Sequence, residues 1–403
     1  MLSNLKPRLL CVWEQGAHLG HLSNLRLPIE VALEQGFEVV LAARELHRVG
    51  EVLGGLPITL LQAPFKQNAV LRDQAAFLSY THLLGQQCFS GSTELEMYVR
   101  AWRGIFDLVQ PRIVLFEHSP TALVAAHAYP FKKVLVGGGF AVPTPELLKK
   151  SPFLPFPTTE LTPAILDGLQ SADDRLLALI NEALGAMGLP VLAALGEIFG
   201  QTHAHFLATW PALDHFGERV NTRYLGVAPA SCSRSAVWPS GTGAKVFAYL
   251  QVFPALEQLL QDLQSAPVCT LLLVRDLPPT LRQRFTNDRM RFIDDIVDLQ
   301  HVAAQADWVV HHGNHSTMAV FMLGGVPQLV IPRHQEHLFS ALRLVSQGAA
   351  AMVFQDQSSF ATAIHTMLTN GQLKQNAVQI ASRSTPFDRA GVQDYVRRVY
   401  SDA

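Results

Sequence analysis

The residues best suited to chemistry in this chain lie in two histidine-containing turns, GAHLGH at 16–21 and HHGNHST at 311–317. An imidazole titrates near neutral pH and can take a proton from a hydroxyl group, so the first turn offers a general base. Hydroxyl groups and backbone N–H groups at the start of a helix attract anions. The second turn therefore offers a phosphate-binding site.

The second turn follows an apolar run at 308–310 and precedes an apolar helix expected at 318–323 and a strand expected at 328–332. Open α/β sheets bind ligands beyond the carboxyl ends of their strands, which is where the hydroxyls of Ser316 and Thr317 would lie. An ordinary βαβ turn with N-capping hydroxyls contains the same residue types. The turn alone leaves both interpretations open.

Short apolar runs alternate with amphipathic segments on both sides of these turns. This alternation predicts an α/β protein with a doubly wound parallel sheet in each half. In the first half, strands are expected at 9–13, 38–42, 113–116 and 133–136. In the second half, strands are expected at 245–249, 270–274, 291–293 and 308–310, with helices at 254–263 and 299–304.

Breaks in the alternation indicate the domain boundaries. A proline-rich segment at 143–163 and a mostly helical stretch to about residue 200 predict an insertion in the first domain. A segment rich in Gly, Ser, Pro and Ala predicts a linker. The expected parts are a first domain at 1–225, a linker at 226–243, a second domain at 244–385 and a helix at 386–403.

The composition favours a folded, soluble, cytoplasmic protein. Lys plus Arg number 31 against 33 Asp plus Glu, so the chain lacks the positive field that would hold nucleic acid. The four cysteines form no CxxC pair, which is typical of a reducing compartment. The N-terminal apolar run is too short for a signal peptide. The apolar stretch 176–195 contains Asn181 and Glu182, so it predicts a buried helix pair and no stable membrane insertion.

The second turn and the residues after it resemble the donor motif of nucleotide-sugar glycosyltransferases, which include UDP-glucuronosyltransferases, plant glucosyltransferases and bacterial macrolide glycosyltransferases. The first turn resembles the same family. The resemblance implies the GT-B architecture, with two Rossmann-like domains facing a cleft and a C-terminal helix that returns to the first domain. The matching residues are His311-His312-Gly313, Thr317, Gly325-Val326-Pro327, Pro332, Ala341 and Gly348-Ala349 in the second half, and Gly20-His21, Gly36 and Val39 in the first.

The resemblance assigns donor binding to the second domain and acceptor binding to the first. The donor would be a UDP- or dTDP-sugar used as a co-substrate, with no separate cofactor. The expected donor contacts are His312, Gly313, Asn314, Ser316 and Thr317 for the diphosphate, the backbone near Val297 for the nucleobase, and Glu336 and His337 for the sugar.

Three departures from the family motif bear on the donor. Asn314 replaces a glycine, a change that the backbone tolerates if the position needs a positive φ. Val320 replaces the glutamate that binds the ribose hydroxyls, and valine cannot accept a hydrogen bond. A deoxyribose suffers less from this loss, which keeps a dTDP-sugar as a hypothesis. Glu336 and His337 replace an Asp-Gln pair, so the sugar can differ from glucose.

In this family the histidine of the first turn is the general base that deprotonates the acceptor, which assigns that role to His21 ahead of His18. Glu117 occupies the place of the acid that orients this base in the plant enzymes. His118 is a competing candidate. A Rossmann-type turn would explain the glycines as well, and a core or capping role would explain His21. With these assignments, one displacement would invert the anomeric configuration.

The acceptor is expected to be a small, hydrophobic molecule in an apolar pocket of the first domain. A core role would also explain most of the candidate aromatic residues. These candidates are Phe65, Phe77, Tyr80, Phe89, Trp102, Phe140, Phe153 and Phe156.

The density of histidine in the second domain raises the question of a metal site. Gly313 interrupts the first histidine group and no HExxH motif occurs, so no metal is expected. The histidines in question are His311, His312, His315, His334 and His337.

Three other functions share parts of this pattern. A nucleotide-sugar 2-epimerase has the same architecture, and a non-catalytic nucleotide-sugar binding protein would accommodate Val320 and Asn314. A periplasmic-type binding protein also has two domains, but it would need a signal sequence. The sequence favours a bacterial glycosyltransferase and does not set the oligomeric state.

Overall fold

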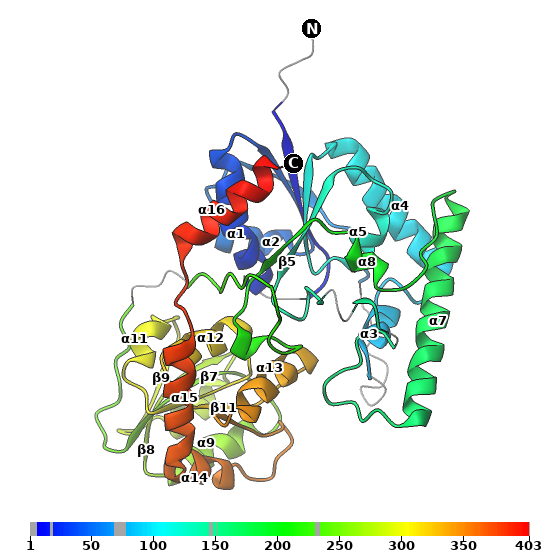
Figure 1. Cartoon of the computed structure of the whole chain (residues 1–403). Coiled ribbons are helices and arrows are strands. Elements are labelled where there is room, and N and C mark those ends of the chain that lie inside the picture. The colour runs from blue at the N-terminus through cyan, green and yellow to red at the C-terminus, as the bar shows by residue number, and fades with distance from the viewer. Residues whose placement is uncertain are drawn as a thin grey trace. The chain divides into compact units, whose positions relative to one another are not determined.

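The computed structural model describes residues 6–16, 19–67, 78–144, 148–150, 152–229 and 234–402. His18 and Phe77 lie outside these residues. The chain divides into two compact units (Figure 1). Unit 1 comprises Met1–Ala208, Asn221–Leu225 and Arg389–Ala403, and unit 2 comprises Thr209–Val220 and Gly226–Asp388.

Segment 209–220 belongs to unit 2, although the sequence analysis assigned it to the first domain. The reason is apolar packing. Trp210 and Leu213 of this segment are buried in one cluster with Met318, Met322 and Leu344 of unit 2.

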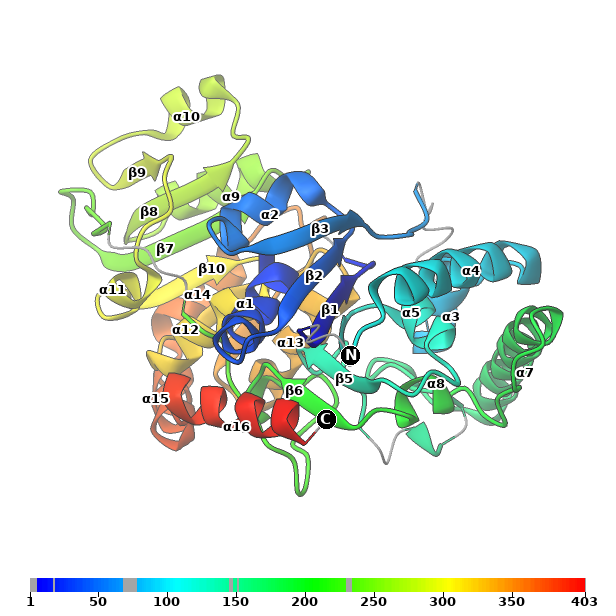
Figure 2. The same ribbon diagram turned by 90° about the horizontal axis from the view of Figure 1, so that it is seen from above.

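A six-stranded parallel sheet forms the centre of unit 1, in the order β3-β2-β1-β4-β5-β6 (Figure 2). The order reverses between β1 and β4, and this switch point is where doubly wound sheets bind ligands. Trp13 at the end of β1 pairs with Ala43 of β2 and Glu117 of β4, so the three carboxyl ends are level. The unit 1 elements are β1 (Arg8–Trp13), α1 (Leu19–Glu34), β2 (Glu38–Ala43), α2 (Leu46–Leu53), β3 (Ile58–Gln62), α3 (Tyr80–Gln86), α4 (Ser92–Val109), β4 (Ile113–Glu117), α5 (Pro120–Ala125), β5 (Lys132–Gly137), α7 (Pro163–Ala186), α8 (Glu197–Gly200), β6 (Ala204–Leu207) and α16 (Arg389–Ser401).

Unit 2 repeats this plan with a parallel sheet in the order β12-β11-β10-β7-β8-β9. Its switch point lies between β10 and β7, and the apolar core includes Phe247, Leu272 and Val310. Its elements are η2 (Pro211–Leu213), β7 (Ala244–Gln251), α9 (Leu256–Ser265), β8 (Val268–Arg275), α10 (Pro279–Phe285), β9 (Met290–Ile293), α11 (Leu299–Ala303), β10 (Trp308–His311), α12 (His315–Leu323), β11 (Gln328–Val330), α13 (Gln335–Ser346), β12 (Ala350–Met352), α14 (Ala361–Thr369) and α15 (Gly371–Arg383).

The strands expected from the sequence are present in both sheets, and β3, β6 and β12 are additions to them. The expected helix pair at 176–195 is wrong. The segment instead contains the end of one long helix, α7, which terminates at Ala186 and buries only one face, with Leu176 and Ile180 inward. Among the described residues, no helix is long and apolar enough to cross a membrane.

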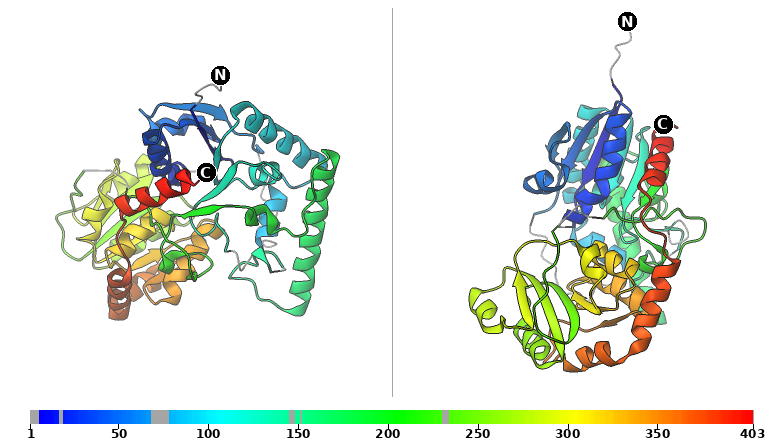
Figure 3. Two further views of the ribbon diagram at one scale, coloured as in Figure 1. Left: turned by 45° about the horizontal axis from the view of Figure 1, so that its top comes forward. Right: turned by 90° about the vertical axis from the view of Figure 1, so that its left-hand side faces the viewer.

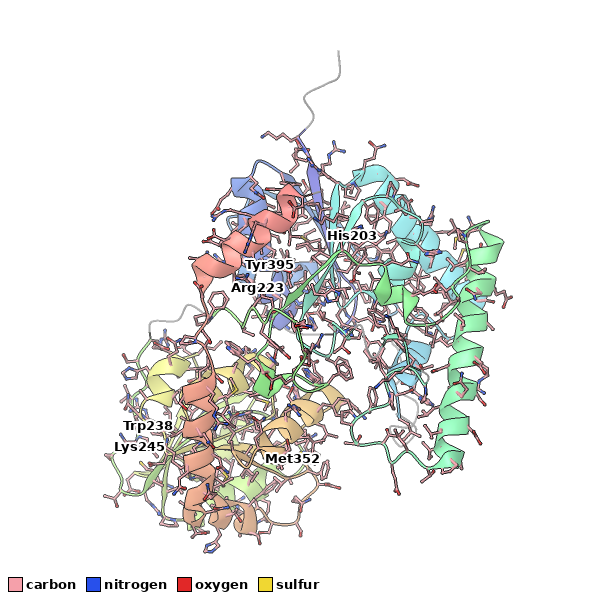
Figure 4. The ribbon with its side chains drawn as sticks, in the orientation of Figure 1. His203, Arg223, Trp238, Lys245, Met352 and Tyr395 are labelled. Atoms are coloured by element: carbon pink, nitrogen blue, oxygen red, sulfur yellow. The ribbon has the colours of Figure 1, made fainter. Side chains whose placement is uncertain are left out.

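Helix α16 returns to unit 1 and packs against α1 (Figure 3). Its Tyr400 is 1% exposed, and the phenol hydroxyl donates to the carbonyl of Pro28 in α1 at 3.2 Å. On the same helix, the ring centre of Tyr395 lies 4.8 Å from the guanidinium of Arg223 (Figure 4). The last helix of the chain is therefore part of the core of unit 1.

We predict that Tyr400→Ala lowers the free energy of unfolding by about 3–5 kcal/mol, because it leaves a cavity between α16 and α1. Arg397→Ala is the control. Arg397 forms exposed ion pairs with Glu34 and Asp394, which water screens, so its loss should change the free energy of unfolding far less. Urea unfolding followed by tryptophan fluorescence measures both. Equal effects of the two substitutions would contradict this account of the helix.

Candidate active site

His21 lies in the first turn of α1, beside the carboxyl ends of β1 and β4. Its Nδ1 lies 2.7 Å from Oε2 of Glu117, the last residue of β4. With the proton on Nδ1, the imidazole donates to the carboxylate and Nε2 carries the lone pair. The ring of Trp13, from the end of β1, stacks on the imidazole with 5.5 Å between the ring centres. The structure thus brings together the two residues that the sequence analysis paired.

Asn24 holds the second oxygen of the same carboxylate, through an Nδ2–Oε1 hydrogen bond of 3.1 Å. Glu117 is only 1% exposed, so its negative charge depends on such partners. The sequence analysis did not assign Asn24 a role. The spacing could have indicated this role. Asn24 is three residues after His21, and residues three apart in a helix lie on the same face.

Two glycines leave room for this pair. A methyl group on Gly16 would overlap the imidazole of His21, and a methyl group on Gly137 would lie 3.1 Å from Oε1 of Glu117. Both glycines have positive φ angles, 80° and 136°, that side chains rarely adopt. The backbone at Gly16 can therefore lie close to the imidazole ring.

His118, the competing candidate for the base, is buried beside the pair. Burial, together with the neighbouring His21, lowers the pKa of His118 to about 4. Its ring stacks against His21 with 5.9 Å between centres and meets the edge of Phe140 at the same distance. The imidazole of His118 is therefore uncharged near neutral pH and poorly suited to accept a proton, so His118 lines the site and does not act as the base.

We predict that Gly16→Ala breaks the hydrogen bond between His21 and Glu117. Gly36→Ala is the matched control, because Gly36 has the same kind of φ angle, 82°, but open space around the added methyl group. Both variants should lose about 1–2 kcal/mol of stability from backbone strain. Only Gly16→Ala should remove the downfield Nδ1–H proton signal of His21 in an NMR spectrum. Retention of that signal in Gly16→Ala would count against the assigned geometry.

In unit 2, both ring nitrogens of His312 contact the backbone. Nδ1 donates to the carbonyl of Ile331 at 2.9 Å, and Nε2 accepts the N–H of Gln251 at 2.9 Å. His312 thereby ties the carboxyl ends of β7 and β10 to the residue after β11. A hydrogen bond from its ring to a diphosphate would have to replace one of these contacts. Burial also lowers the pKa of His312, which favours the uncharged ring.

His311 is held in the same way. Its Nε2 lies 2.8 Å from Oε1 of Gln328, and its Nδ1 accepts the N–H of Gly313 at 2.9 Å. Gly313 has a φ of 96°, and a methyl group there would lie 3.1–3.2 Å from Val330 and His337. Two neutral histidines and one glycine therefore shape the turn from inside the protein.

The start of α12 presents the residues expected to bind the diphosphate. Asn314 precedes the helix with a φ of −54°, so this position does not need a positive φ, and the left-handed conformation lies at Gly313 instead. Ser316 is exposed in the first turn, whereas Thr317 is 4% exposed. Backbone N–H groups in this turn precede the intrahelical hydrogen bonds and can point to an anion.

Val320, in the middle of α12, packs against the apolar cluster that contains Phe247 and Val326. The position that carries a ribose-binding glutamate in the resembling family therefore contributes to packing in this chain.

The segment 209–220 supports the start of α12 within unit 2. Nε2 of His315 lies 2.7 Å from the hydroxyl of Thr209, and the ring of His315 stacks on His215 with 6.0 Å between centres. The hydroxyl of Ser340 lies 2.9 Å from Nε2 of His215. The sequence analysis did not connect these residues, because no local spacing joins 209–220 to the turn.

The other expected donor residues lie elsewhere in unit 2. The side chain of Val297 is 3% exposed and belongs to an apolar cluster. Glu336 is partly buried in the first turn of α13, and His337 beside it is buried with its ring 3.7 Å from that of His334. Among the described residues, no group of three or more His, Cys, Asp or Glu side chains could hold a metal ion.

Four of the eight aromatic residues expected near the acceptor form a buried cluster next to His118. The ring of Phe140 contacts Tyr80 and Phe156, and Tyr80 also contacts Phe153. Each of these four rings is at most 5% exposed. They therefore act first as core residues, and Phe140 links the cluster to His118.

The buried histidines predict a loss of stability in acid. Burial lowers the pKa of His311 to about 4, while an unfolded histidine titrates near 6.5. Between these values only the unfolded chain binds the proton, so the free energy of unfolding falls as the pH falls from 6.5 towards 4. His311 alone should account for about 2 kcal/mol between pH 7.5 and pH 5. Urea unfolding at both pH values measures this, and His311→Gln should show a smaller pH dependence than the natural chain.

Comparisons with known proteins bear on the fold. Residues 277–389 match the family model described as erythromycin biosynthesis protein CIII-like, C-terminal domain. The chain is similar to CalG4, the calicheamicin glycosyltransferase, with a TM-score of 0.67, 15% identity and coverage of 98% of this chain and 99% of that chain. The chain has the GT-B fold. The resemblance inferred from the sequence is confirmed at this level, including the two Rossmann-like sheets and the returning C-terminal helix.

Two further structures share the GT-B fold with this chain. One is the glycosyltransferase VinC in complex with DTDP, with a TM-score of 0.62, 14% identity and coverage of 98% of this chain and 100% of that chain. The other is the spinosyn rhamnosyltransferase SpnG complexed with spinosyn aglycone, with a TM-score of 0.62, 16% identity and coverage of 98% and 100%. A search of curated proteins finds no match.

Proposed function

We propose that the chain is a glycosyltransferase that moves a sugar from a UDP- or dTDP-sugar to a hydroxyl group of a small hydrophobic acceptor. The observation that carries the proposal is the hydrogen bond of 2.7 Å between His21 and the buried carboxylate of Glu117. An imidazole oriented by a carboxylate is the usual arrangement of a general base. It lies at the switch point of the unit 1 sheet, where such sheets bind ligands.

His21 takes the acceptor proton in this mechanism. Nε2 accepts the proton as the acceptor oxygen forms a bond to the anomeric carbon, and the bond from that carbon to the diphosphate breaks at the same time. The electron pair leaves with the nucleoside diphosphate, and the configuration inverts. Glu117 stabilises the imidazolium that forms, and Asn24 keeps the carboxylate in place through its other oxygen.

The N-terminus of α12 binds the donor diphosphate in this proposal. Its backbone N–H groups and the exposed hydroxyl of Ser316 supply hydrogen bonds, and the helix dipole favours the negative charge. The ring of His312 serves mainly to hold the strands on which this turn rests, since its nitrogens contact Ile331 and Gln251. The mechanism requires no metal ion.

The donor sugar nucleotide is a dTDP-sugar in the preferred form of this proposal. Val320 packs in an apolar cluster and offers no acceptor for a ribose hydroxyl, which penalises UDP more than dTDP. VinC, whose structure contains DTDP, has the same fold. A hydrophobic acceptor suits the apolar surroundings of His118 and Phe140, and SpnG of the same fold was solved with spinosyn aglycone.

We predict that His21→Ala lowers kcat for sugar transfer by about 10²–10⁴-fold, because it removes the base. Glu117→Gln should reduce kcat less, because the imidazole remains. Both variants should bind nucleoside diphosphate as the natural chain does, which a thermal-shift titration with dTDP, UDP, GDP and ADP measures. dTDP should raise the melting temperature at least as much as UDP.

The rival functions give different results in the same experiment. A non-catalytic binding protein would be stabilised by the nucleotide but would be indifferent to His21→Ala in every assay. A 2-epimerase would convert the sugar nucleotide without any acceptor present. Absence of stabilisation by all four diphosphates would contradict the assignment of the donor site.

A further inference from the structure

We propose that Glu14 is a positioning residue that holds the strand-to-helix loop of Glu117 in the conformation that the base requires. The proposal rests on the proposed function, because it assigns Glu14 an effect on the base. Glu14 directly follows β1 and is 1% exposed. The mechanism above does not use it, although a buried carboxylate is among the most costly groups to place in a protein interior.

Both carboxylate oxygens of Glu14 bind the first turn of α5. Oε1 accepts the N–H of Thr121 at 3.0 Å, and Oε2 accepts the N–H of Ala122 at 3.0 Å. These two N–H groups have no acceptor within their own helix, because they belong to its first turn. Glu14 thus joins the end of β1 to the start of α5 through two charge-assisted hydrogen bonds.

The loop between β4 and α5 is short, and it contains the strained residue of the site. His118 has a φ of 43°, a left-handed conformation that is unfavourable for a histidine. The N–H of Gln15 donates to the carbonyl of His118 at 3.1 Å, and the hydroxyl of Ser119 donates to the carbonyl of Glu117 at 3.0 Å. Two successive residues after β1 therefore hold this region in place. Glu14 binds the start of α5, and Gln15 binds the carbonyl of His118 in the loop.

This anchoring determines where Glu117 points. If the helix end were released, the loop could relax the strained backbone of His118, and the carboxylate of Glu117 would turn away from His21. Glu14 therefore acts through Glu117, because its own carboxylate oxygens accept hydrogen bonds from α5. Burial raises the pKa of Glu14 to about 7, and the hydrogen bonds from Thr121 and Ala122 oppose this rise.

The test is Glu14→Gln in the full-length chain. The amide group has one acceptor oxygen, so either Thr121 or Ala122 loses its partner. We expect kcat to fall about 10- to 100-fold, with unchanged dTDP binding. The downfield Nδ1–H signal of His21 should move upfield or broaden. The double variant with Glu117→Gln should be no slower than Glu117→Gln alone, because the two residues act on the same step.

Asp173→Asn is the matched control. Asp173 is also a buried carboxylate in unit 1, 6% exposed, and it accepts the N–H of Phe153 and the hydroxyl of Thr81. Its substitution should lower the melting temperature and leave the His21 signal in place. If Glu14→Gln behaves in the same way, with natural kcat and an unchanged signal, the proposal is overturned.

A second variant and the NMR signal of His21 distinguish the possible outcomes. Ser119→Ala removes the hydrogen bond from the Ser119 hydroxyl to the carbonyl of Glu117 without changing a charge. If Glu14→Gln does not fold, Ser119→Ala should still move the His21 signal upfield or broaden it. An unchanged signal in Ser119→Ala would then overturn the proposal. A natural chain that transfers no sugar would contradict the proposed function, whereas the NMR signal of His21 still tests the position of Glu117.

Discussion

The structure of unit 1 around the site depends on one buried charge, the carboxylate of Glu117. A carboxylate shielded from water is tolerated only if polar groups surround it. Here an imidazole and an amide from the same helix supply those groups, one to each oxygen. The helix can approach closely enough because Gly16 and Gly137 have no side chains. The pair of strands β1 and β4, level at their carboxyl ends, supplies the frame.

In unit 2, which has the same kind of fold, histidines have a structural role. Its turn before α12 is shaped by histidines that are buried and uncharged, and their nitrogens serve backbone groups of neighbouring strands. In unit 1 an imidazole is kept next to a carboxylate, where it can gain a proton, whereas in unit 2 burial keeps the imidazoles neutral. The same residue type is thus reactive in one unit and architectural in the other, and the difference lies in its hydrogen-bond partners.

Much of this arrangement could be predicted from the sequence, and the parts that could not have physical reasons. Apolar runs predicted most strands, because parallel strands are buried on both faces. The pairing of His21 with Glu117 followed from a family resemblance that local motifs carry. Asn24 and Glu14 were missed because their partners are almost a hundred residues away or more along the chain. Segment 209–220 was assigned to the wrong domain because apolar packing, which no turn signal announces, decides where it lies.

The placement of α16 has a consequence for how the protein forms during synthesis. Unit 1 contains residues from both sides of unit 2 in the sequence, and its core includes Tyr400, which is synthesised after all of unit 2. Neither unit is one continuous stretch of chain, so neither can be excised by a single cut. Unit 1 must therefore remain incomplete while all of unit 2 is translated, and its native core is finished only once α16 has been synthesised and has packed against α1.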